Sequence, residues 1–324
     1  MIAASLFGRP LPDGGAIGIA APASPYERRS DLLRGLEWWE AQGYRVKLGE
    51  HVLARDDFVA GDPRDRAADL NALFADPEVD AIQCLQGGYG SAQVIPHLDL
   101  DAIAANPKPF VGFSDITALH VVLRQRTGLA TLYGNGLMGM GDTETTAFSK
   151  ERLLAVLRGG GAGALPADPD DPYVRTIRGG KATAPLAGGC LWLLAQTMGT
   201  PWEIELDGAI FFFEDYYLPP YQLDGILTQL AQAGKLREAA GVVVGDMEKC
   251  DWGDHPHGWP RTRTLEDVLE VHLEPLGVPV LYKLPLGHGK HLATIPLGVP
   301  ATLDADARTL TFEGSGLATG GEGD

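Results

Sequence analysis

Short apolar runs alternate with amphipathic helical patterns through the N-terminal part of the chain. The run AIGIA begins at Ala16, and the helical pattern RSDLLRGLEWWEAQ that follows it ends before Gly43. The same order recurs at VDAIQCLQ, and again at KPFVGF, which precedes the helical pattern SDITALHVVLRQ. Strands that alternate with helices pair in a parallel sheet with helices on its faces. The sequence therefore predicts an α/β fold with a doubly wound parallel sheet.

The composition changes between residues 159 and 184, where Gly, Pro and Asp dominate and no hydrophobic period is sustained. Segments of this kind are typical of connections between domains. Beyond it come a helical pattern, a very apolar run ending in FFFED, another helical pattern and the run GVVVGDME. We expect an N-terminal α/β domain over 1–158, a linker over 159–184 and a smaller mixed α+β domain over 185–324. A length of 324 residues suits two domains.

The charge balance limits the classes of partner. With 43 acidic and 26 basic residues, the chain has a formal net charge of -17, which repels nucleic acid phosphates and anionic lipid headgroups. The first residues lack a basic segment followed by an unbroken apolar run, and no apolar segment has the ~18 residues that a bilayer span requires. We expect a cytoplasmic protein with neither nucleic acid nor membrane as its partner.

The cysteine and histidine spacing gives no metal signature. Cys84, Cys190 and Cys250 are far apart and form no CxxC pair, so disulfides and structural zinc are not expected. His255 and His257 lie in the segment DHPHG without a third ligand nearby, which is more typical of a solvated loop than of a metal site. We expect no metal and no cofactor.

Ser114 follows the apolar run KPFVGF directly and precedes a helical pattern. A serine between a strand and a helix lies at the carboxyl edge of a parallel sheet, where ligands bind, and resembles the turn that exposes a nucleophilic serine. The second glycine of that motif is missing here. The residues SDIT are also typical of a helix N-cap. The pattern alone leaves both interpretations open.

Two further residues and one loop complete the parts required for acyl transfer. Glu214 ends a run of phenylalanines, where a buried carboxylate requires a partner, although it could also be a solvated strand end. His288 lies between two glycines and could equally be a loop residue without a role. The loop QGGYGS lacks the spacing of a phosphate loop but offers backbone amides to an oxyanion. Together with Ser114 they could supply a nucleophile, a base, an orienting acid and anion-binding amides.

Several long motifs resemble the LD-carboxypeptidases, serine peptidases that include murein tetrapeptide carboxypeptidases and microcin C immunity proteins. The motifs lie in the same order over nearly the whole chain and include AAPAS, QGGYG, NPKPFVGFSDITALH, GGCLWLLAQTMGTP, FFFEDYYLPPYQLDGILTQL and LPLGHGKHLATIPLGVP. The resemblance implies a flavodoxin-like N-terminal domain facing a smaller C-terminal domain, in a homodimer. It also implies that Ser114 is the nucleophile, that Glu214 and His288 complete a triad, and that the amides of Gly88 and Asp115 form the oxyanion hole.

The chain departs from the family pattern near the expected cleft. Familiar members often read RGGYG, GGN, and EDVGE with IDR, whereas this chain has Gln86, Cys190, Leu218 and Gly225 at the differing positions. Replacing Arg by Gln86 removes a bidentate partner for a carboxylate. The first expectation is therefore an enzyme that removes a terminal D-amino acid from murein-derived tetrapeptide, in peptidoglycan recycling. The alternatives are hydrolysis of an aminoacyl or peptidyl nucleotide amide, and a binding protein without turnover.

Four residues are candidate substrate contacts: Gln86, Tyr89, Trp252 and Trp259. The two tryptophans flank the segment 253–258 and could stack on a base or a sugar, or could pack on the surface of the protein.

The triad hypothesis also makes a prediction for three serine and histidine variants. We expect Ser114→Ala or His288→Ala to abolish hydrolysis and Ser91→Ala to leave it nearly unchanged.

Overall fold

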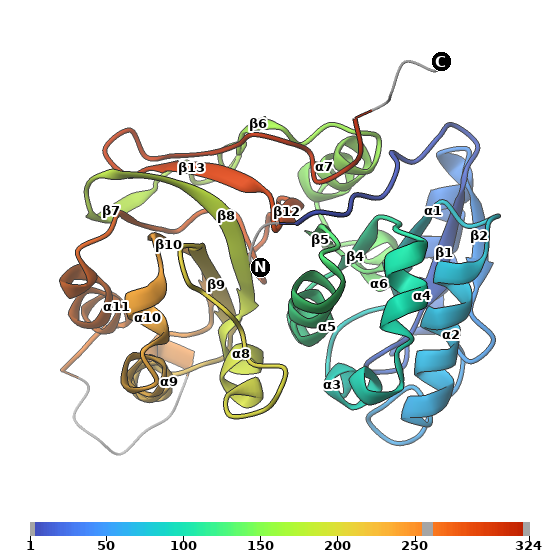
Figure 1. Ribbon diagram of the computed structural model, residues 1–324, viewed down its shortest axis with the longest axis horizontal. Coiled ribbons are helices and arrows are strands. Elements are labelled where there is room, and N and C mark those ends of the chain that lie inside the picture. Colours follow the sequence, from blue (N-terminus) through green and yellow to red (C-terminus); the bar gives the residue numbers. More distant parts are fainter. Residues whose placement is uncertain (1–3, 255–261, 320–324) are drawn as a thin grey trace.

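Two bodies, each built on its own β-sheet, lie side by side in the computed structural model, which describes residues 4–254 and 262–319 (Figure 1). The first sheet has the strand order β12-β5-β4-β3-β1-β2, and the second has the order β6-β14-β13-β8-β9-β10-β11-β7. No described helix is both long enough and apolar enough to cross a membrane.

The first sheet has the order of a flavodoxin-like fold. Strands β2, β1, β3, β4 and β5 are parallel neighbours, and only β12 joins them antiparallel. This order confirms the prediction of a flavodoxin-like parallel sheet. The strands are β1 (Ala16–Ala20), β2 (Arg45–Leu48), β3 (Ala81–Cys84), β4 (Phe110–Gly112), β5 (Thr131–Tyr133) and β12 (Ile295–Leu297).

Helices cover both faces of this sheet because its strands are apolar on both sides. Ile17 and Ile19 of β1 pack with α1, α6 and α7, whereas Ile82 of β3 packs on the opposite face with α2, α4 and α5. The helices are α1 (Arg29–Ala41), α2 (Pro63–Ala75), α3 (Ser91–Val94), α4 (Leu100–Ala105), α5 (Thr117–Val122), α6 (Leu137–Gly141) and α7 (Ala147–Leu157).

The second sheet is mixed. Its centre, β8 to β11, is parallel, and β7, β13, β14 and β6 add antiparallel edges. Phe211 and Phe213 of β9 face one core and Phe212 faces the other, as the period of two requires. The strands are β6 (Gly163–Ala164), β7 (Arg175–Arg178), β8 (Lys181–Cys190), β9 (Ile210–Tyr216), β10 (Gly241–Glu248), β11 (Val280–Tyr282), β13 (Pro300–Asp304) and β14 (Thr309–Phe312). The helices are α8 (Leu191–Thr197), α9 (Pro220–Gln232), α10 (Lys235–Glu238) and α11 (Leu265–Leu273).

Residues 159–184, which the composition predicts as a linker, contain regular structure. They include β6, β7 and the first residues of β8, all of which belong to the second sheet. Short strands that pair with partners far along the chain carry no local period, so the sequence pattern did not indicate them. The boundary between the two domains stays a prediction.

The chain crosses between the two bodies more than once. After β11 it passes through the loop 283–294 and enters the first sheet as β12, where Ile295 pairs with Tyr133 and Leu297 with Thr131. It then returns to the second sheet as β13. Figure 1 shows β12 between the two bodies, next to β5. The loop that carries His288 is therefore anchored to both sheets at once.

Candidate active site

Ser114 lies at the end of β4, in a strained backbone conformation. It opens a short 3-10 turn over Ser114–Ile116, just before α5, and has φ of 60°. A non-glycine residue in this region of φ costs on the order of 1–3 kcal/mol and points to a functional constraint. A Cβ on Gly87 would lie 2.8 Å from Ser114 Cβ, so only glycine allows the loop 86–91 to approach this closely.

The Ser114 hydroxyl faces His288. Its Oγ lies 3.0 Å from His288 Nε2, and His288 Nδ1 lies 2.6 Å from Glu214 Oε2. The backbone N–H of His288 also donates to Glu214 Oε2, at 3.2 Å. A Cβ on Gly287 would lie 2.3 Å from the same oxygen, which explains the glycine before the histidine. The structure thus brings together the three residues that the sequence analysis proposed as a triad.

Tyr133 is a fourth member of this hydrogen-bond chain, and the sequence analysis did not predict it. The hydroxyl of this buried residue at the end of β5 donates to Glu214 Oε1 at 2.6 Å and accepts the backbone N–H of Ser114 at 3.1 Å. Burial, together with the charge of Glu214, raises the pKa of Tyr133 well above its usual value, so the phenol remains a donor. The fully buried Glu214 carboxylate therefore has partners on both of its oxygens.

The charge of Glu214 sets the basicity of His288. Burial lowers the pKa of the imidazole, but the attraction and hydrogen bond of Glu214, with smaller effects of Asp215 and Glu248, outweigh burial. The pKa of His288 is therefore raised from its ordinary value of 6.5. A raised pKa makes the neutral ring a stronger base and stabilises the imidazolium that proton transfer from a serine creates.

The predicted oxyanion residues lie beside Ser114. Gly88, with φ of 99°, belongs to the same loop as Gly87, whose added Cβ would lie 3.2 Å from the backbone nitrogen of Asp115. The backbone N–H of Ser91 donates to Asp115 Oδ2 at 2.7 Å, and the Ser91 hydroxyl donates to the carbonyl of Asp115. These bonds fix the glycine loop to the turn of Ser114. Ser91 is fully buried, so Ser91→Ala would remove the hydroxyl bond to Asp115, and its small effect on hydrolysis stays a prediction.

Two hollows meet at Ser114, and His288 lines both. The first, here called the aromatic hollow, has a volume of about 430 Å³ and includes Cys190, Trp192, Leu193, Asp215, Tyr216, Tyr217, Leu218 and Gln222. The second, the polar hollow, has a volume of about 350 Å³ and includes Ser24, Glu27, Arg28, Asp31, Gln86, Asn135, Asp142 and Thr145. Gly88 lines both as well. Open space therefore lies on two sides of Ser114.

The predicted substrate contacts differ in position. Gln86 lines the polar hollow and donates to the carbonyl of Pro25. Tyr89 is 48% exposed and packs edge-on against Phe58, and it lines neither hollow. Trp252 stacks on Tyr221 with ring centroids 6.2 Å apart, also outside the two hollows.

The remaining candidate residues, the positions that depart from the family pattern and the cysteines lie in several parts of the chain. Trp259, His255 and His257 lie outside the described residues. Of the positions that depart from the family pattern, Cys190 and Leu218 line the aromatic hollow, and Gly225 lies in α9. Cys84, Cys190 and Cys250 are buried free thiols. Within residues 4–254 and 262–319, no cluster of histidine, cysteine and carboxylate side chains could hold a metal ion.

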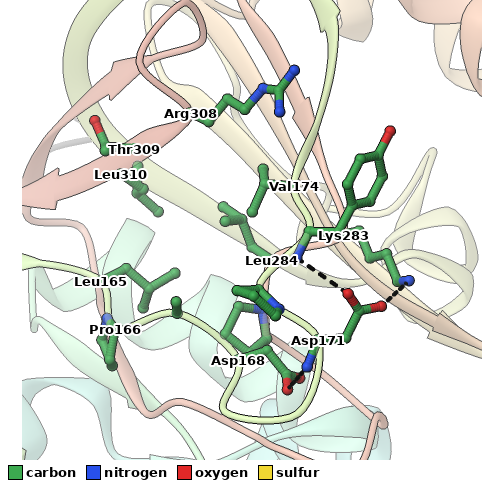
Figure 2. Close-up of a pocket in the computed structure, with 14 residues that line it drawn as sticks. Leu165, Pro166, Asp168, Asp171, Val174, Lys283, Leu284, Arg308, Thr309 and Leu310 are labelled. Atoms are coloured by element: carbon green, nitrogen blue, oxygen red, sulfur yellow. Dashed lines mark hydrogen bonds and ion pairs between the residues drawn. The ribbon is translucent and has the colours of Figure 1, made fainter.

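A further pocket, here called the distal pocket, lies away from Ser114 (Figure 2). Its volume is about 510 Å³, and its lining includes Leu165, Asp168, Asp171, Tyr173, Lys283, Leu284, Arg308 and Leu310. Figure 2 shows Lys283 reaching Asp171, with Nζ and Oδ2 2.6 Å apart. None of the residues proposed as catalytic or substrate-binding is among its described lining residues.

The fold is a two-domain α/β fold in which Ser114, His288 and Glu214 are hydrogen-bonded, and comparison with known proteins identifies the family. Sequence models of the LD-carboxypeptidase N-terminal and C-terminal domains match residues 17–134 and 183–303. The chain belongs to the LD-carboxypeptidase family, peptidase family S66.

Individual relatives span almost the whole chain. The probable murein peptide carboxypeptidase of Bacillus subtilis is 35% identical, covering 96% of this chain and 95% of the relative. The murein tetrapeptide carboxypeptidase of Pseudomonas aeruginosa is 31% identical, covering 91% and 95%. The solved structure of MccF in complex with glutamyl sulfamoyl guanosine has a TM-score of 0.87 at 25% identity, covering 97% of this chain and 100% of that chain.

Proposed function

We propose that the protein is a serine carboxypeptidase of the LD type, which removes a terminal D-amino acid from murein-derived tetrapeptide. One observation carries the proposal: Ser114 Oγ, His288 and buried Glu214 form a continuous hydrogen-bond chain with distances of 3.0 and 2.6 Å. The names of the relatives in Bacillus subtilis and Pseudomonas aeruginosa support murein peptide as the substrate class.

The reaction runs through an acyl-enzyme. His288 Nε2 takes the proton of Ser114 Oγ as the oxygen attacks the scissile carbonyl, and the amides of Gly88 and Asp115 donate to the developing oxyanion. The imidazolium, stabilised by Glu214, then gives its proton to the leaving amine, and the C–N bond breaks. A water molecule, deprotonated by His288, attacks the acyl ester, and its proton returns to Ser114 as the acid is released.

Mass spectrometry of the purified protein with a tetrapeptide ending in D-alanine tests the proposal. We expect loss of one D-alanine with the native protein, and a loss of turnover of about 10⁴- to 10⁶-fold in Ser114→Ala. A Ser114→Ala variant that cleaves at the native rate would contradict the mechanism. No cleavage by the folded native protein would contradict the substrate.

Hydrolysis of an aminoacyl or peptidyl nucleotide amide is the second candidate. The observation that favours it is the aromatic hollow, where Trp192 and Tyr217 are 44% and 52% exposed and offer faces on which a base can stack. The MccF structure with glutamyl sulfamoyl guanosine supports the same alternative. Adding an aminoacyl sulfamoyl adenosine to the assay separates the two candidates, and a binding protein without turnover would cleave neither compound.

The cellular setting is part of the proposal. An acidic chain with no membrane-spanning helix among its described residues agrees with a cytoplasmic enzyme of peptidoglycan recycling. We also propose a homodimer, which sedimentation equilibrium of the full chain tests: a mass of one 34.5 kDa chain at assay concentration would contradict it.

A further inference from the structure

Arg28 places a positive charge in the polar hollow. Among the described residues that line the aromatic and polar hollows, it is the only lysine or arginine. It lies immediately before α1 and shares the polar hollow with Ser114 and His288. An enzyme that releases one terminal residue requires a group that recognises the terminal carboxylate, and a guanidinium is the side chain that binds carboxylates in a bidentate geometry.

The guanidinium of Arg28 contacts one carboxylate closely and forms a longer ion pair with a second. Its Nε lies 2.6 Å from Asp31 Oδ2, and the Asp31 side chain is almost fully buried. The same carboxylate also pairs with Arg34, so the single negative charge of Asp31 is shared between two arginines. Arg28 Nη2 is 3.9 Å from Asp142 Oδ1, beyond hydrogen-bond distance, and the Arg28 side chain is 64% exposed. A ligand oxygen can therefore reach this edge.

Within the aromatic and polar hollows, the remaining charges favour one position for a carboxylate. Glu27 and Asp142 also line the polar hollow, so a ligand carboxylate is favoured there only in contact with Arg28. The aromatic hollow contains Asp215, directly after Glu214, and no lysine or arginine among its described residues. A ligand carboxylate in that hollow would find no guanidinium or ammonium group among the described lining residues. His288 lines both hollows, so the amine of a leaving residue in the polar hollow can still receive its proton.

We propose that Arg28 binds the α-carboxylate of the leaving residue in the polar hollow, and thereby restricts cleavage to the last residue of a peptide. The acyl part of the substrate then occupies the aromatic hollow. This inference rests on the proposed carboxypeptidase function. Arg28 acts as a specificity-determining residue, because its contact is with a part of the substrate that does not react.

A pair of substrates that differ only at the terminus tests the proposal. The full-length protein is assayed with the tetrapeptide ending in D-alanine and with the same peptide as its C-terminal amide. We expect the native protein to have kcat/KM about 10- to 100-fold higher for the acid. Arg28→Gln should lose this preference by lowering kcat/KM for the acid alone, and Arg28→Lys should restore part of it.

Arg29→Gln is the matched control. Arg29 is the next residue, is exposed, carries the same charge and lines neither hollow. We expect its preference for the acid to equal that of the native protein. Equal effects of Arg28→Gln and Arg29→Gln would show that overall charge alone sets the preference for the acid, and would overturn the proposal. A native protein that cleaves acid and amide equally would also overturn it.

Binding to the Ser114→Ala protein separates this inference from the proposed function. Calorimetry should show tighter binding of the acid than of the amide, and the difference should vanish in the Ser114→Ala, Arg28→Gln double variant. Arg28-dependent binding without turnover by the native protein would support the carboxylate site while contradicting the function. Turnover without any difference in binding would support the function and overturn the role of Arg28.

Discussion

The cleft at Ser114 and the distal pocket differ less in size than in the state of their charged groups. The distal pocket is the larger, at about 510 Å³ against about 430 and 350 Å³ for the two hollows of the cleft. Its central pair, Lys283 and Asp171, has side chains that are 43% and 52% exposed. Exposed ion pairs are screened by solvent and contribute little to stability.

In the cleft at Ser114, by contrast, the central charged group is buried and paired. Glu214 is fully buried, and each of its oxygens has a hydrogen-bond partner, from Tyr133 on one side and His288 on the other. A buried charge of this kind is tolerated only when it is paired, and it changes the proton affinity of the groups that pair with it. The comparison indicates that buried titratable groups in contact with one another distinguish the proposed active site from the distal pocket better than volume does.

Substitution at Gly287 should produce the largest effect of the changes considered in this comparison. A Cβ there would lie 2.3 Å from Glu214 Oε2, and φ of 114° disfavours any side chain. We expect Gly287→Ala to displace His288 and to lower kcat by about 100-fold or more, because small misplacements of catalytic groups are costly. The measurement is kcat with the tetrapeptide, together with the melting temperature.

Gly225→Ala is the control for that glycine. Gly225 lies inside α9 and has open space where a Cβ would be added. We expect unchanged kcat and about 0.5–1 kcal/mol of added stability. Full activity of Gly287→Ala would show that the close contact with Glu214 does not position the histidine.

Removing one hydroxyl from the cleft should have an intermediate effect. Tyr133→Phe takes away the donor to Glu214 Oε1 and the acceptor of the Ser114 amide, and leaves a buried carboxylate oxygen without this partner. Such a loss costs about 1–3 kcal/mol, which predicts a kcat about 10- to 100-fold lower. Steady-state kinetics measures it, and an unchanged kcat would limit Tyr133 to a packing role.

The pH dependence of the reaction tests the electrostatic coupling in the cleft. In the proposed mechanism the neutral form of His288 is the base, so activity should fall as the pH is lowered through its pKa, which lies above 6.5. We expect kcat/KM, measured from about pH 5 to about pH 9, to reach half of its plateau above the ordinary pKa of histidine. A midpoint below pH 6.5 would mean that burial outweighs Glu214.

A change in the distal pocket should have the smallest effect. Arg308 lines that pocket and none of the described lining of the two hollows. We expect Arg308→Ala to leave kcat/KM within about twofold of the native value, as for surface substitutions away from buried features. A loss as large as that of Tyr133→Phe would instead show that the distal pocket is coupled, through the loop from Lys283, to His288.

The sequence predicted the part of the structure that local pattern encodes. The alternation of apolar runs with helical patterns indicated the parallel sheet, and its strand order confirms it. Ser114, Glu214 and His288 each stand beside a strand end or a pair of glycines, which made them visible as candidates. Their proximity could not be derived from the pattern, because it depends on how the two sheets pack.

The residues that the sequence did not reveal have ordinary local patterns. Tyr133 ends a short strand, TLY, where an aromatic residue is common, and only its position beside Ser114 and Glu214 makes it important. Ser91 follows a glycine loop like any helix-start serine, and its burial arises from contact with Asp115. Arg28 precedes α1 in a charged segment, and only the cavity distinguishes it from Arg29.

The pairing of β12 with β5 has a consequence for the way the protein is made. The strand at Ile295–Leu297 completes the edge of a sheet whose other strands all lie before residue 134. During synthesis β5 therefore remains the edge strand of the first sheet until most of the polypeptide has left the ribosome. In the finished protein the edge strand is β12, in which Pro296 lacks the N–H that pairing with another chain would use. A nascent chain stalled before Ile295 should therefore bind chaperones more than the finished protein does. A fragment that ends before Ile295 should be less soluble when expressed alone than when expressed together with the remaining residues.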